Sequence, residues 1–400
     1  MAVTDVTERA VRRTTSPLDL LYRPEVRQVL FQVLLVVVLG ALFWMIITNT
    51  MDNLRRQNIA SGFGFWNTTA GFDISQTLIE YTNTSSYGRA FWVGFWNTVL
   101  VAAIGIVLAT VVGFTMGVAR LSRNWLIARL ATVYIETIRN IPLLLQLFVW
   151  YFAVLKWLPP PRQSLELPGG AFLNLRGLYV PAPLPKPGFS AVLMAFAVGV
   201  IAAVAVAMWA RRRQQLTGAQ FPTALTALGL VVALPAATFT LAGAPLEFDY
   251  PQLRGFNFQG GIAIQPELIA LVLGLVIYTG AFIAEIVRAG IQGVPKGQKE
   301  AALAIGLSPG QTLRLVVIPQ AMRIIIPPLT SNYLNLTKNS SLAVAIAYPD
   351  LVSVFSGTVL NQTGQAVEVI FITMVVYLAI SLVTSGFMNW FNRRVALVER

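Results

Sequence analysis

Eight long apolar stretches constrain the fold of this chain more than any other feature of its sequence. A helix needs about 20 mostly apolar residues to cross the hydrocarbon core of a bilayer. Apolar residues make up 56% of the 400 residues and charged residues only 12%, about half the charged fraction of a soluble domain. We therefore predict an all-α integral membrane protein whose eight spans are residues 28–49, 91–119, 127–157, 189–209, 221–243, 262–288, 320–345 and 366–391.

Lysine and arginine are distributed unevenly between the segments that connect these spans. Of the 29 basic residues, 19 fall in one alternating set of segments and seven in the other. Because short basic segments are retained in the cytoplasm, both termini are predicted to be cytoplasmic. Topology then explains the net charge of +12, and no nucleic acid is expected as a partner. The basic set comprises residues 1–27, 120–129, 211–213, 288–323 and 392–400.

The chain has no cysteine and no histidine. This excludes disulfides, thiolate or imidazole chemistry and the usual zinc ligands. Any metal site would need carboxylates, which are scarce, so we predict neither a metal nor a catalytic residue. A membrane enzyme would need clustered nucleophiles or acids that face water in one leaflet, and the sequence offers no such cluster.

Two long segments, 50–90 and 158–188, are rich in turn-forming residues and are predicted to be surface loops on the outside. Residues 189–243 contain two spans with almost no polar side chains, joined by the arginines at 211–213. This segment resembles an inserted helical hairpin. We favour a lipid-facing position for it, although the sequence does not give it a role.

The cytoplasmic stretch 288–319 predicts two short helices joined by a turn. Pro295 can start the first helix, and Gly306 suits the position just past its end, where a left-handed backbone favours glycine. Ser308 suits an N-cap, and Gln311 three residues later completes a capping box. Small alanines in the first helix leave room for close approach by another surface, so the stretch is predicted to be a docking site.

Residues in this stretch also match a known pattern. Glu300, Ala301 and Ala302 are followed by Gly306 and then by the run from Val316 to Pro319, which resembles the EAA loop of ABC importer permeases. Only Val316 departs from the pattern, where isoleucine is usual. In that family the loop forms a coupling helix that sits in a cleft of the ATPase subunit. The resemblance assigns ATPase coupling to Lys299, Glu300, Ala301, Ala302, Gly306, Leu307, Ser308 and Pro319.

Two further stretches, 134–142 and 284–291, are similar to segments of the polar amino acid permeases, the histidine-type branch of these importers. Chain length, the extra first helix and the insertion resemble the larger permease of general L-amino acid systems. The resemblance implies a MetI-like type I importer fold in the bacterial inner membrane, among membrane lipids. It implies a second related permease as heterodimer partner, an ATPase dimer that binds ATP and Mg, a periplasmic amino acid-binding protein and an amino acid substrate. No cofactor is expected on this chain, which has no Walker motif.

The spans and the resemblance together divide the chain. Residues 91–158 and 262–391 are predicted to form the two parts of the permease core, with the coupling loop at 289–319. The remaining segments are a cytoplasmic segment 1–27, an extra helix 28–49, a periplasmic loop 50–90, a periplasmic loop with the inserted hairpin 159–261 and a cytoplasmic tail 392–400.

Charged residues inside a bilayer usually pair and face the interior of the bundle. Glu136 with Arg139, and Glu285 with Arg288, repeat one Glu-x-x-Arg spacing that places each pair on one helix face. Both pairs are predicted to lie near the cytoplasmic side. They fit either an inner gate that rearranges during transport or a static structural cluster.

The span at 320–345 is interrupted by Pro327 and Pro328 and carries a polar run. Irregular backbone at membrane depth is tolerated where it lines a cavity. Because an amino acid carries a carboxylate, Lys338 is a candidate to hold it, with Asn335, Asn339 and Ser340 as hydrogen-bonding partners. The alternative is that Lys338 pairs with a carboxylate of a neighbouring helix or of the partner permease.

The segment 348–365 resembles the periplasmic connection of the family before its last helix. It fits either a surface that faces the binding protein or an ordinary loop helix. A different class, an ion-gradient-driven secondary transporter of small polar solutes, would usually show internal repeats and acidic residues that carry ions. We find no clear repeat, and both intramembrane glutamates have an arginine nearby, so the importer is favoured.

Overall fold

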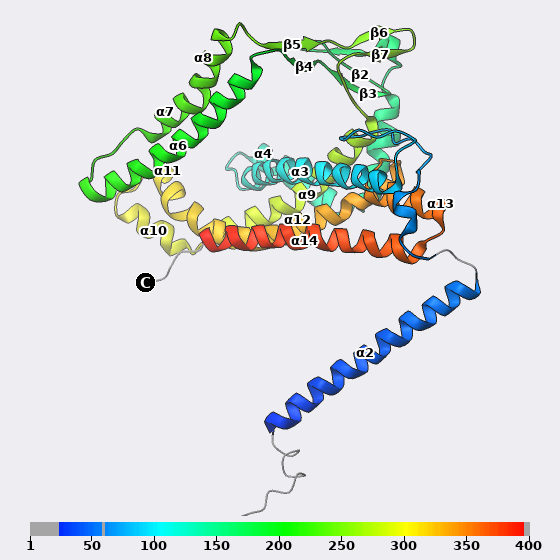
Figure 1. Cartoon of the computed structure of the whole chain (residues 1–400). Coiled ribbons are helices and arrows are strands. Elements are labelled where there is room, and N and C mark those ends of the chain that lie inside the picture. Colours follow the sequence, from blue (N-terminus) through cyan, green and yellow to red (C-terminus); the bar gives the residue numbers. More distant parts are fainter. Residues whose placement is uncertain (1–23, 58–60, 396–400) are drawn as a thin grey trace, which may run out of the picture.

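The computed structural model describes residues 24–57 and 61–395 (Figure 1). Most of the predicted cytoplasmic segment 1–27, and residues 396–400 of the predicted tail, lie outside the described residues. Within them, seven helices are long and apolar enough to cross a membrane, and one bent pair makes an eighth candidate. These elements coincide with the eight predicted spans and confirm a mostly helical membrane protein.

The spans are built from the following elements, in which η marks a 3₁₀ or π helix. They are α2 (Pro24–Arg56), α3 (Tyr87–Arg120), α4 (Trp125–Asn140) with α5 (Leu143–Phe148), η2 (Val149–Val154) and η3 (Leu155–Trp157), α6 (Phe189–Thr217), α7 (Thr223–Leu228) with η5 (Gly229–Ala233) and α8 (Leu234–Leu241), α9 (Pro266–Gln292), α12 (Ile318–Asn339) with η7 (Ser340–Ile346), and α14 (Ala366–Val395). Helix α12 runs through both internal prolines.

The predicted span 127–157 is sharply bent. Its two halves, Trp125–Asn140 and Leu143–Trp157, meet at 108°. Proline disfavours the helical conformation in the residue before it, and Ile141, which precedes Pro142, is extended with φ −101° and ψ 126°. The local sequence therefore explains the bend, although hydropathy alone predicted one continuous span.

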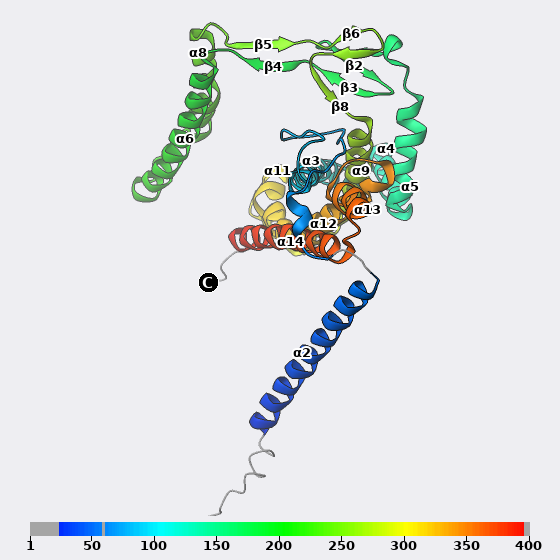
Figure 2. The same cartoon turned by 45° about the vertical axis from the view of Figure 1, so that its right-hand side comes forward.

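Helices α3, α9, α12 and α14 run side by side and form the core (Figures 1 and 2). Helix α9 is the most buried span, with 56% of its most apolar window inside the bundle. Close approach of α3 to α9 depends on small residues: a Cβ added at Gly117 would lie 2.6 Å from the carbonyl oxygen of Ala284. Helix α2 stands apart from this bundle, and no residue of its apolar window is buried.

We expect Gly117→Val to destabilise the bundle by about 1–3 kcal/mol, the usual cost of overpacking a close contact. The added methyl groups would push α3 away from the backbone of α9. The measurement is the thermal stability of the chain in detergent. Gly386→Val in α14 is the matched control, because nothing lies within 4 Å of a Cβ at that position. Equal melting temperatures for the two variants would contradict this account of the packing.

The two segments that flank the hairpin pair with each other through short strands, a feature that the sequence analysis described only as loops. A four-stranded antiparallel sheet has the order β1 (Leu165–Leu167), β2 (Ala171–Asn174), β3 (Gly177–Val180) and β8 (Ile262–Ile264). Two ribbons pair β4 (Ala182–Pro185) with β5 (Leu246–Asp249), and β6 (Gln252–Arg254) with β7 (Asn257–Gln259). The strands have three or four residues each, which is too short for a period-two pattern to stand out.

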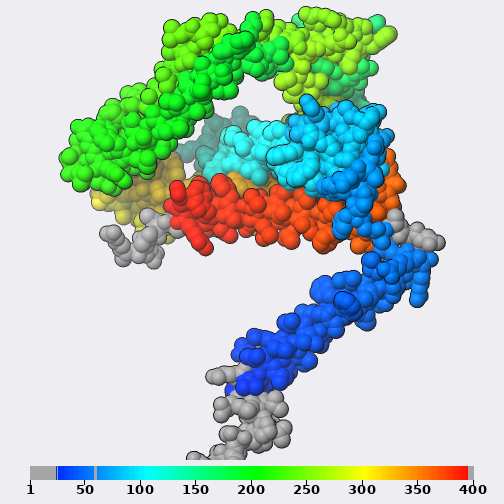
Figure 3. Space-filling model, in the orientation of Figure 1, coloured from blue at the N-terminus to red at the C-terminus, as the bar shows by residue number. Residues whose placement is uncertain are grey.

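The hairpin consists of α6 packed along α7, η5 and α8. Its contact is close, because a Cβ at Gly199 would clash with the carbonyl oxygen of Leu230. The ribbon of β4 and β5 joins this hairpin to the rest of the chain, and an open space separates it from α3 (Figures 2 and 3). Most of its apolar side chains are exposed, as expected of helices surrounded by lipid.

The predicted topology requires alternate connections to share one side of the bundle. In Figure 1 the start of α2, the α3–α4 turn, the α6–α7 turn and the end of α14 lie toward the same side, together with the short helices α10 (Lys296–Ala304) and α11 (Pro309–Thr312). The strands lie toward the other side. That the first of these sides is cytoplasmic stays a prediction.

Candidate functional site

The predicted coupling loop folds as two short helices. Helix α10 ends at Ala304, and Gly306 follows with φ +83°, the left-handed conformation that favours glycine. Ser308 accepts a hydrogen bond from the backbone N–H of Gln311, and the side chain of Gln311 accepts one from the backbone N–H of Ser308. The predicted helix end and the capping box are both confirmed.

The outer surface of this loop combines exposed apolar and polar side chains. Ile305 is 79% exposed and Leu303 is 42% exposed. Among the residues assigned to coupling, Lys299, Glu300, Ala301, Gly306 and Ser308 are exposed, Leu307 is partly buried and Ala302 is buried. Pro319 is exposed but lies in the first turn of α12, outside the two short helices. The loop therefore exposes large apolar side chains beside polar ones.

A cavity of about 690 Å³ lies beneath the loop. It is lined by Lys299 and Leu303 of α10, by Leu313 of the following helix η6 (Leu313–Val317), and by Arg123 of the α3–α4 turn. The loop and the α3–α4 turn therefore share one surface at this end of the bundle.

Arg120, at the end of α3, connects the charged residues near this end. Its guanidinium lies 2.7 Å from an Oε of Glu285 on α9 and 2.8 Å from an Oε of Glu136 on α4. Glu285 also pairs with Arg288, as predicted. The network therefore joins three helices, and α9 leads directly into the coupling loop.

The predicted Glu136–Arg139 pair is wrong. Glu136 pairs with Arg120 instead, and the guanidinium of Arg139 lies 5.2 Å from the ring centroid of Phe282 on α9. The i,i+3 spacing places both side chains on one helix face, but the approach of α3 offers Glu136 a different partner. In the sequence, Arg120 counts only among the basic residues that predict orientation, so its ion pairs were not predicted.

The two ion pairs of Arg120 differ in strength. Glu136 is 52% exposed, and surface pairs of this kind contribute about 0–1 kcal/mol. Glu285 has a side-chain exposure of only 24% and holds two arginines. Loss of its charge would leave Arg288 without a carboxylate and Arg120 with only the exposed Glu136, so Glu285 is the central member of the network.

The four predicted pathway residues do not converge on one site. Asn335 and Asn339 line a polar cavity of about 250 Å³ together with Asn332 of α12 and with three residues of α9, Tyr278, Thr279 and Phe282. Ser340 is fully buried and donates a hydrogen bond to the carbonyl oxygen of Thr337. Successive residues of a helix point about 100° apart, so Lys338 and Asn339 face different sides.

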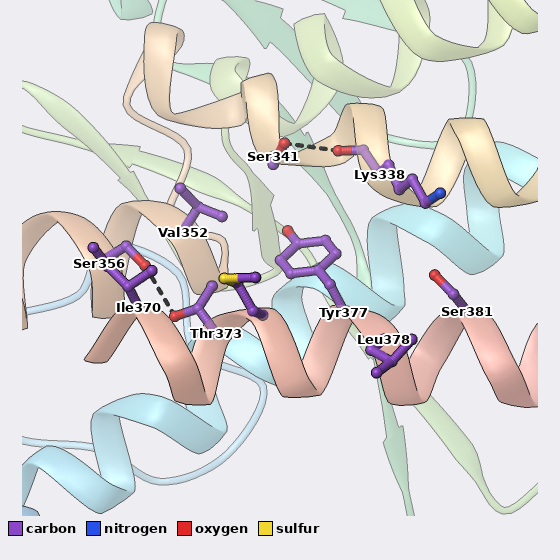
Figure 4. Close-up of a pocket in the computed structure, with 10 residues that line it drawn as sticks. Lys338, Ser341, Val352, Ser356, Ile370, Thr373, Tyr377, Leu378 and Ser381 are labelled. Atoms are coloured by element: carbon purple, nitrogen blue, oxygen red, sulfur yellow. Dashed lines mark hydrogen bonds between the residues drawn. The ribbon is translucent and has the colours of Figure 1, made fainter. Parts of the chain in front are cut away.

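Lys338 faces a separate cavity of about 600 Å³ between α12 and α14. Figure 4 shows it opposite Tyr377 and Ser381 of α14, with Thr373 and Ser356 hydrogen-bonded to each other farther along that helix. Among the described residues, Lys338 forms no ion pair with a carboxylate of this chain. The intrachain pairing that the sequence analysis kept as an alternative is therefore not formed.

The segment 348–365 begins inside the protein. Tyr348, Asp350 and Leu351 are fully buried, and the amide of Asn97 on α3 donates to the carbonyl oxygen of Pro349 at 2.8 Å. The remainder forms η8 (Val352–Val359) and α13 (Leu360–Thr363). The first residues of this segment therefore cannot form a surface that faces another protein in this conformation.

Asp350 lies outside the membrane-spanning helices, yet its carboxyl group is buried. The carboxyl accepts hydrogen bonds from the backbone N–H of Ser353 at 2.8 Å and from the hydroxyl of Tyr377 at 3.2 Å. Burial raises the pKa of Asp350 to about 7, although these hydrogen bonds lower it in part. The residue therefore changes charge near neutral pH.

We expect the stability of the chain to fall as pH rises toward 7. A raised carboxyl pKa means that the folded state binds the proton more tightly than the unfolded state, so this contribution is complete at acidic pH and is lost as pH passes the folded pKa. Asp350→Asn should flatten the dependence of melting temperature on pH between about 5 and 8, while Asp249→Asn on the exposed β5 should leave it unchanged. An unaltered slope in Asp350→Asn would contradict the assignment.

These features define a class of protein. Multiple membrane spans, cavities that adjoin α9, α12 and α14, and an exposed loop directly after a span that ion pairs hold to its neighbours together describe a membrane transport subunit.

Comparison with known proteins identifies the family. The chain belongs to the binding-protein-dependent transport system inner membrane components, whose family model matches residues 105–397. It is thus a multi-pass inner membrane protein and a transport component. The match includes residues 105–158 of the first predicted part of the permease core, the whole second part and the coupling loop. It confirms the permease fold expected from the EAA resemblance.

Three curated relatives resemble the chain over nearly all of its length. The general L-amino acid transport system permease protein AapQ of Rhizobium johnstonii is 54% identical over 95% of each chain. The amino-acid ABC transporter permease protein YhdX of Escherichia coli, whose name is qualified there as putative, is 54% identical over 94% of this chain and 96% of its own length. The glutamate/glutamine/aspartate/asparagine transport system permease protein BztB of Rhodobacter capsulatus is 39% identical over 95% of this chain and 96% of its own.

Proposed function

We propose that the chain is a permease subunit of an ATP-driven ABC importer that moves polar or general L-amino acids from the periplasm to the cytoplasm. Three relatives that match it over nearly their full length carry names of amino acid permeases. Lys338 and the asparagines of α12 add polar groups to cavities at membrane depth, as recognition of a polar solute requires.

The proposed complex contains four kinds of component. Two ATPase subunits hold ATP and Mg and receive the coupling loop of this chain, which has no catalytic role and binds no cofactor. A second, related permease completes the pathway as a heterodimer, and a periplasmic binding protein delivers the amino acid. The lipid bilayer surrounds the spans and the hairpin.

The exposed coupling loop is the single observation that carries this proposal. Its exposed isoleucine at 305 and the polar residues around it have no partner surface within the described part of this chain. Purification of a tagged chain in mild detergent should therefore recover an ATPase and a second permease in fixed ratio, with ATPase activity in the eluate. A chain that is recovered alone, and that supports uptake driven by an ion gradient, would replace the proposal with secondary transport.

We further propose that Glu136, Glu285, Arg288 and Arg120 form an inner gate that responds to the coupling loop. Gln292, the last residue of α9, accepts a hydrogen bond from Arg288 at 2.5 Å. Movement of the loop would therefore pull on the same helix that carries Glu285. Arg139, which stacks on Phe282 rather than on a carboxylate, would steady α4 against α9.

For the substrate pathway, the structure favours two candidate surfaces on α12. One is the asparagine face with Asn335 and Asn339, and the other is the cavity that Lys338 shares with α14. The buried Ser340 is better placed to support the backbone than to contact a solute.

We expect Lys338→Met to reduce uptake at least tenfold if this lysine attracts the substrate carboxylate, while assembly with the ATPase stays intact. A charge-assisted hydrogen bond in a low-dielectric cavity is stronger than one in water, which explains the size of the effect. Uptake by proteoliposomes is the measurement, and Lys186→Met, in the exposed turn after β4, is the control. Normal uptake by Lys338→Met would refute substrate contact.

A further inference from the structure

A polar cavity lies away from the α12 surfaces, where the inserted segment meets the core. Its volume is about 380 Å³, within the range of small-molecule sites. Five separate parts of the chain contribute to it: the loop before α3, the end of the bent span, the β2–β3 turn, the start of α9 and the residue after η7. The lining includes Ser75, Tyr151, Lys156, Arg176, Gln265, Glu267 and Ala347.

This cavity contains both signs of charge. Glu267 lies in the first turn of α9 and is partly buried, and one of its Oε atoms accepts a hydrogen bond from the hydroxyl of Tyr151 at 2.7 Å. Lys156 and Arg176 contribute two cations from other segments. Within the ranges that the structure describes, neither cation forms an ion pair with Glu267. The ammonium group of Lys156 lies 5.3 and 5.8 Å from the ring centroids of Tyr151 and Phe152. The carboxylate and the two cations therefore do not neutralise one another, and a ligand with both charges would be attracted to them.

A fourth polar group in the lining, the side-chain amide of Gln265, is only partly hydrogen-bonded. The side-chain nitrogen of Gln265 donates to the carbonyl oxygen of Ser75, which fixes the amide, while its buried Oε1 accepts no hydrogen bond in the described part of the chain. A buried acceptor without a donor is costly. The amide of Gln265 holds the loop before α3 against the start of α9 at the edge of the cavity.

The position of Arg176 is built into the fold. Its backbone N–H donates to the side-chain oxygen of the fully buried Asn174 at 2.8 Å. The next residue, Gly177, has φ +125°, and a Cβ there would clash with the carbonyl oxygen of Ile264. The turn is thus held against β8 just before α9 begins, so the inserted segment delivers a cation to a cavity of the permease core.

We propose that this cavity is an outer binding subsite for the main-chain part of a free amino acid. Glu267 receives its ammonium group, and Arg176 with Lys156 receives its carboxylate. Arginine is suited to carboxylates because it donates two parallel hydrogen bonds. All α-amino acids share these two groups. A subsite that binds only them does not distinguish amino acid side chains, which fits an importer of many different amino acids. This inference rests on the proposed function.

The test uses the purified complex with its ATPase, its partner permease and its binding protein. Binding of radiolabelled L-glutamine and L-leucine is measured without the binding protein, and ATP-driven uptake is measured with it. Glu267→Gln keeps an acceptor for Tyr151, and Arg176→Gln alters an exposed side chain, so both should assemble. The matched controls are Glu247→Gln and Lys186→Gln, an exposed ion pair on β5 and the turn after β4 with a separation of 3.0 Å.

We expect Glu267→Gln and Arg176→Gln to weaken binding of both amino acids at least tenfold, with the controls within twofold of the unmodified complex. The N-acetyl and amide derivatives of glutamine, each lacking one of the two charges, should fail to compete. If the variants lose uptake but bind both amino acids normally, the cavity contacts the binding protein and the subsite is wrong.

Two further results separate this inference from the proposed function. An unmodified complex that imports amino acids, with variants that match the controls in binding and uptake, would overturn the subsite alone. An unmodified complex that neither imports nor binds either amino acid would overturn both proposals.

Discussion

Ile305→Asp should abolish recovery of the ATPase with this chain and should reduce ATP-driven uptake at least tenfold. Ile305 is the most exposed apolar residue of the coupling loop, at 79%. In the variant, residue 305 loses its apolar contact with the ATPase, and docking must bury an unpaired carboxylate. Burial of an unpaired charge weakens binding by several kcal/mol. The measurement is the ratio of ATPase to permease after purification in mild detergent, followed by uptake in proteoliposomes.

Leu216→Asp is the matched control for this experiment. Leu216 lies near the end of α6, on the same side of the molecule as the loop, and is 85% exposed. This substitution, like Ile305→Asp, replaces an exposed aliphatic side chain by a carboxylate, but at a position outside the loop. If both variants lose the ATPase equally, the effect is general, and the assignment of the loop as the docking surface is wrong.

Glu285→Gln should uncouple ATP hydrolysis from uptake. Glu285 holds Arg120 at 2.7 Å and also pairs with Arg288, so its neutralisation frees the end of α3 from the end of α9. Breaking a buried pair by removing one partner costs about 3–5 kcal/mol, and this partly exposed network should lose less. We expect ATPase activity in the absence of binding protein to rise severalfold while uptake falls at least tenfold.

Two further variants sharpen this result. Arg120→Gln removes the bridge itself and should reproduce the uncoupling, whereas Glu136→Gln should have a smaller effect because that carboxylate is half exposed. Arg129→Gln, at an exposed position of α4, serves as the control. A coupling ratio in Glu285→Gln equal to that of the control would show that the network is structural rather than a gate.

The helices and their ends could be predicted because their signals are local. Long apolar runs identified all eight spans, and Gly306 with the capping box of Ser308 and Gln311 fixed the form of the coupling loop. The bend at Pro142 carried a local signal too, since the residue before a proline avoids the helical conformation. The bend was not predicted because hydropathy averaged over a long window stays high across Pro142.

Only some of the predicted contacts between site residues are formed. Glu285 and Arg288 pair as expected because they lie one turn apart on the same helix. Lys338 and Asn339 face different cavities, which the 100° step between neighbouring helical residues already implies. The raised pKa of Asp350 had no signal in the sequence, because it follows from burial by α3 and α14.

By itself, the sequence determined which segments are long and apolar enough to cross a membrane and how the two short helices around Gly306 and Ser308 begin and end, since hydropathy and caps act over a few residues. Only the tertiary structure decided that Glu136 forms its ion pair with Arg120 and not with Arg139. It also decided that strands from either side of the hairpin pair with each other, and that Arg176 and Glu267 line the same cavity. These outcomes join residues far apart in the chain. They depend on how closely two helices or strands approach, which is set by the packing of the whole bundle.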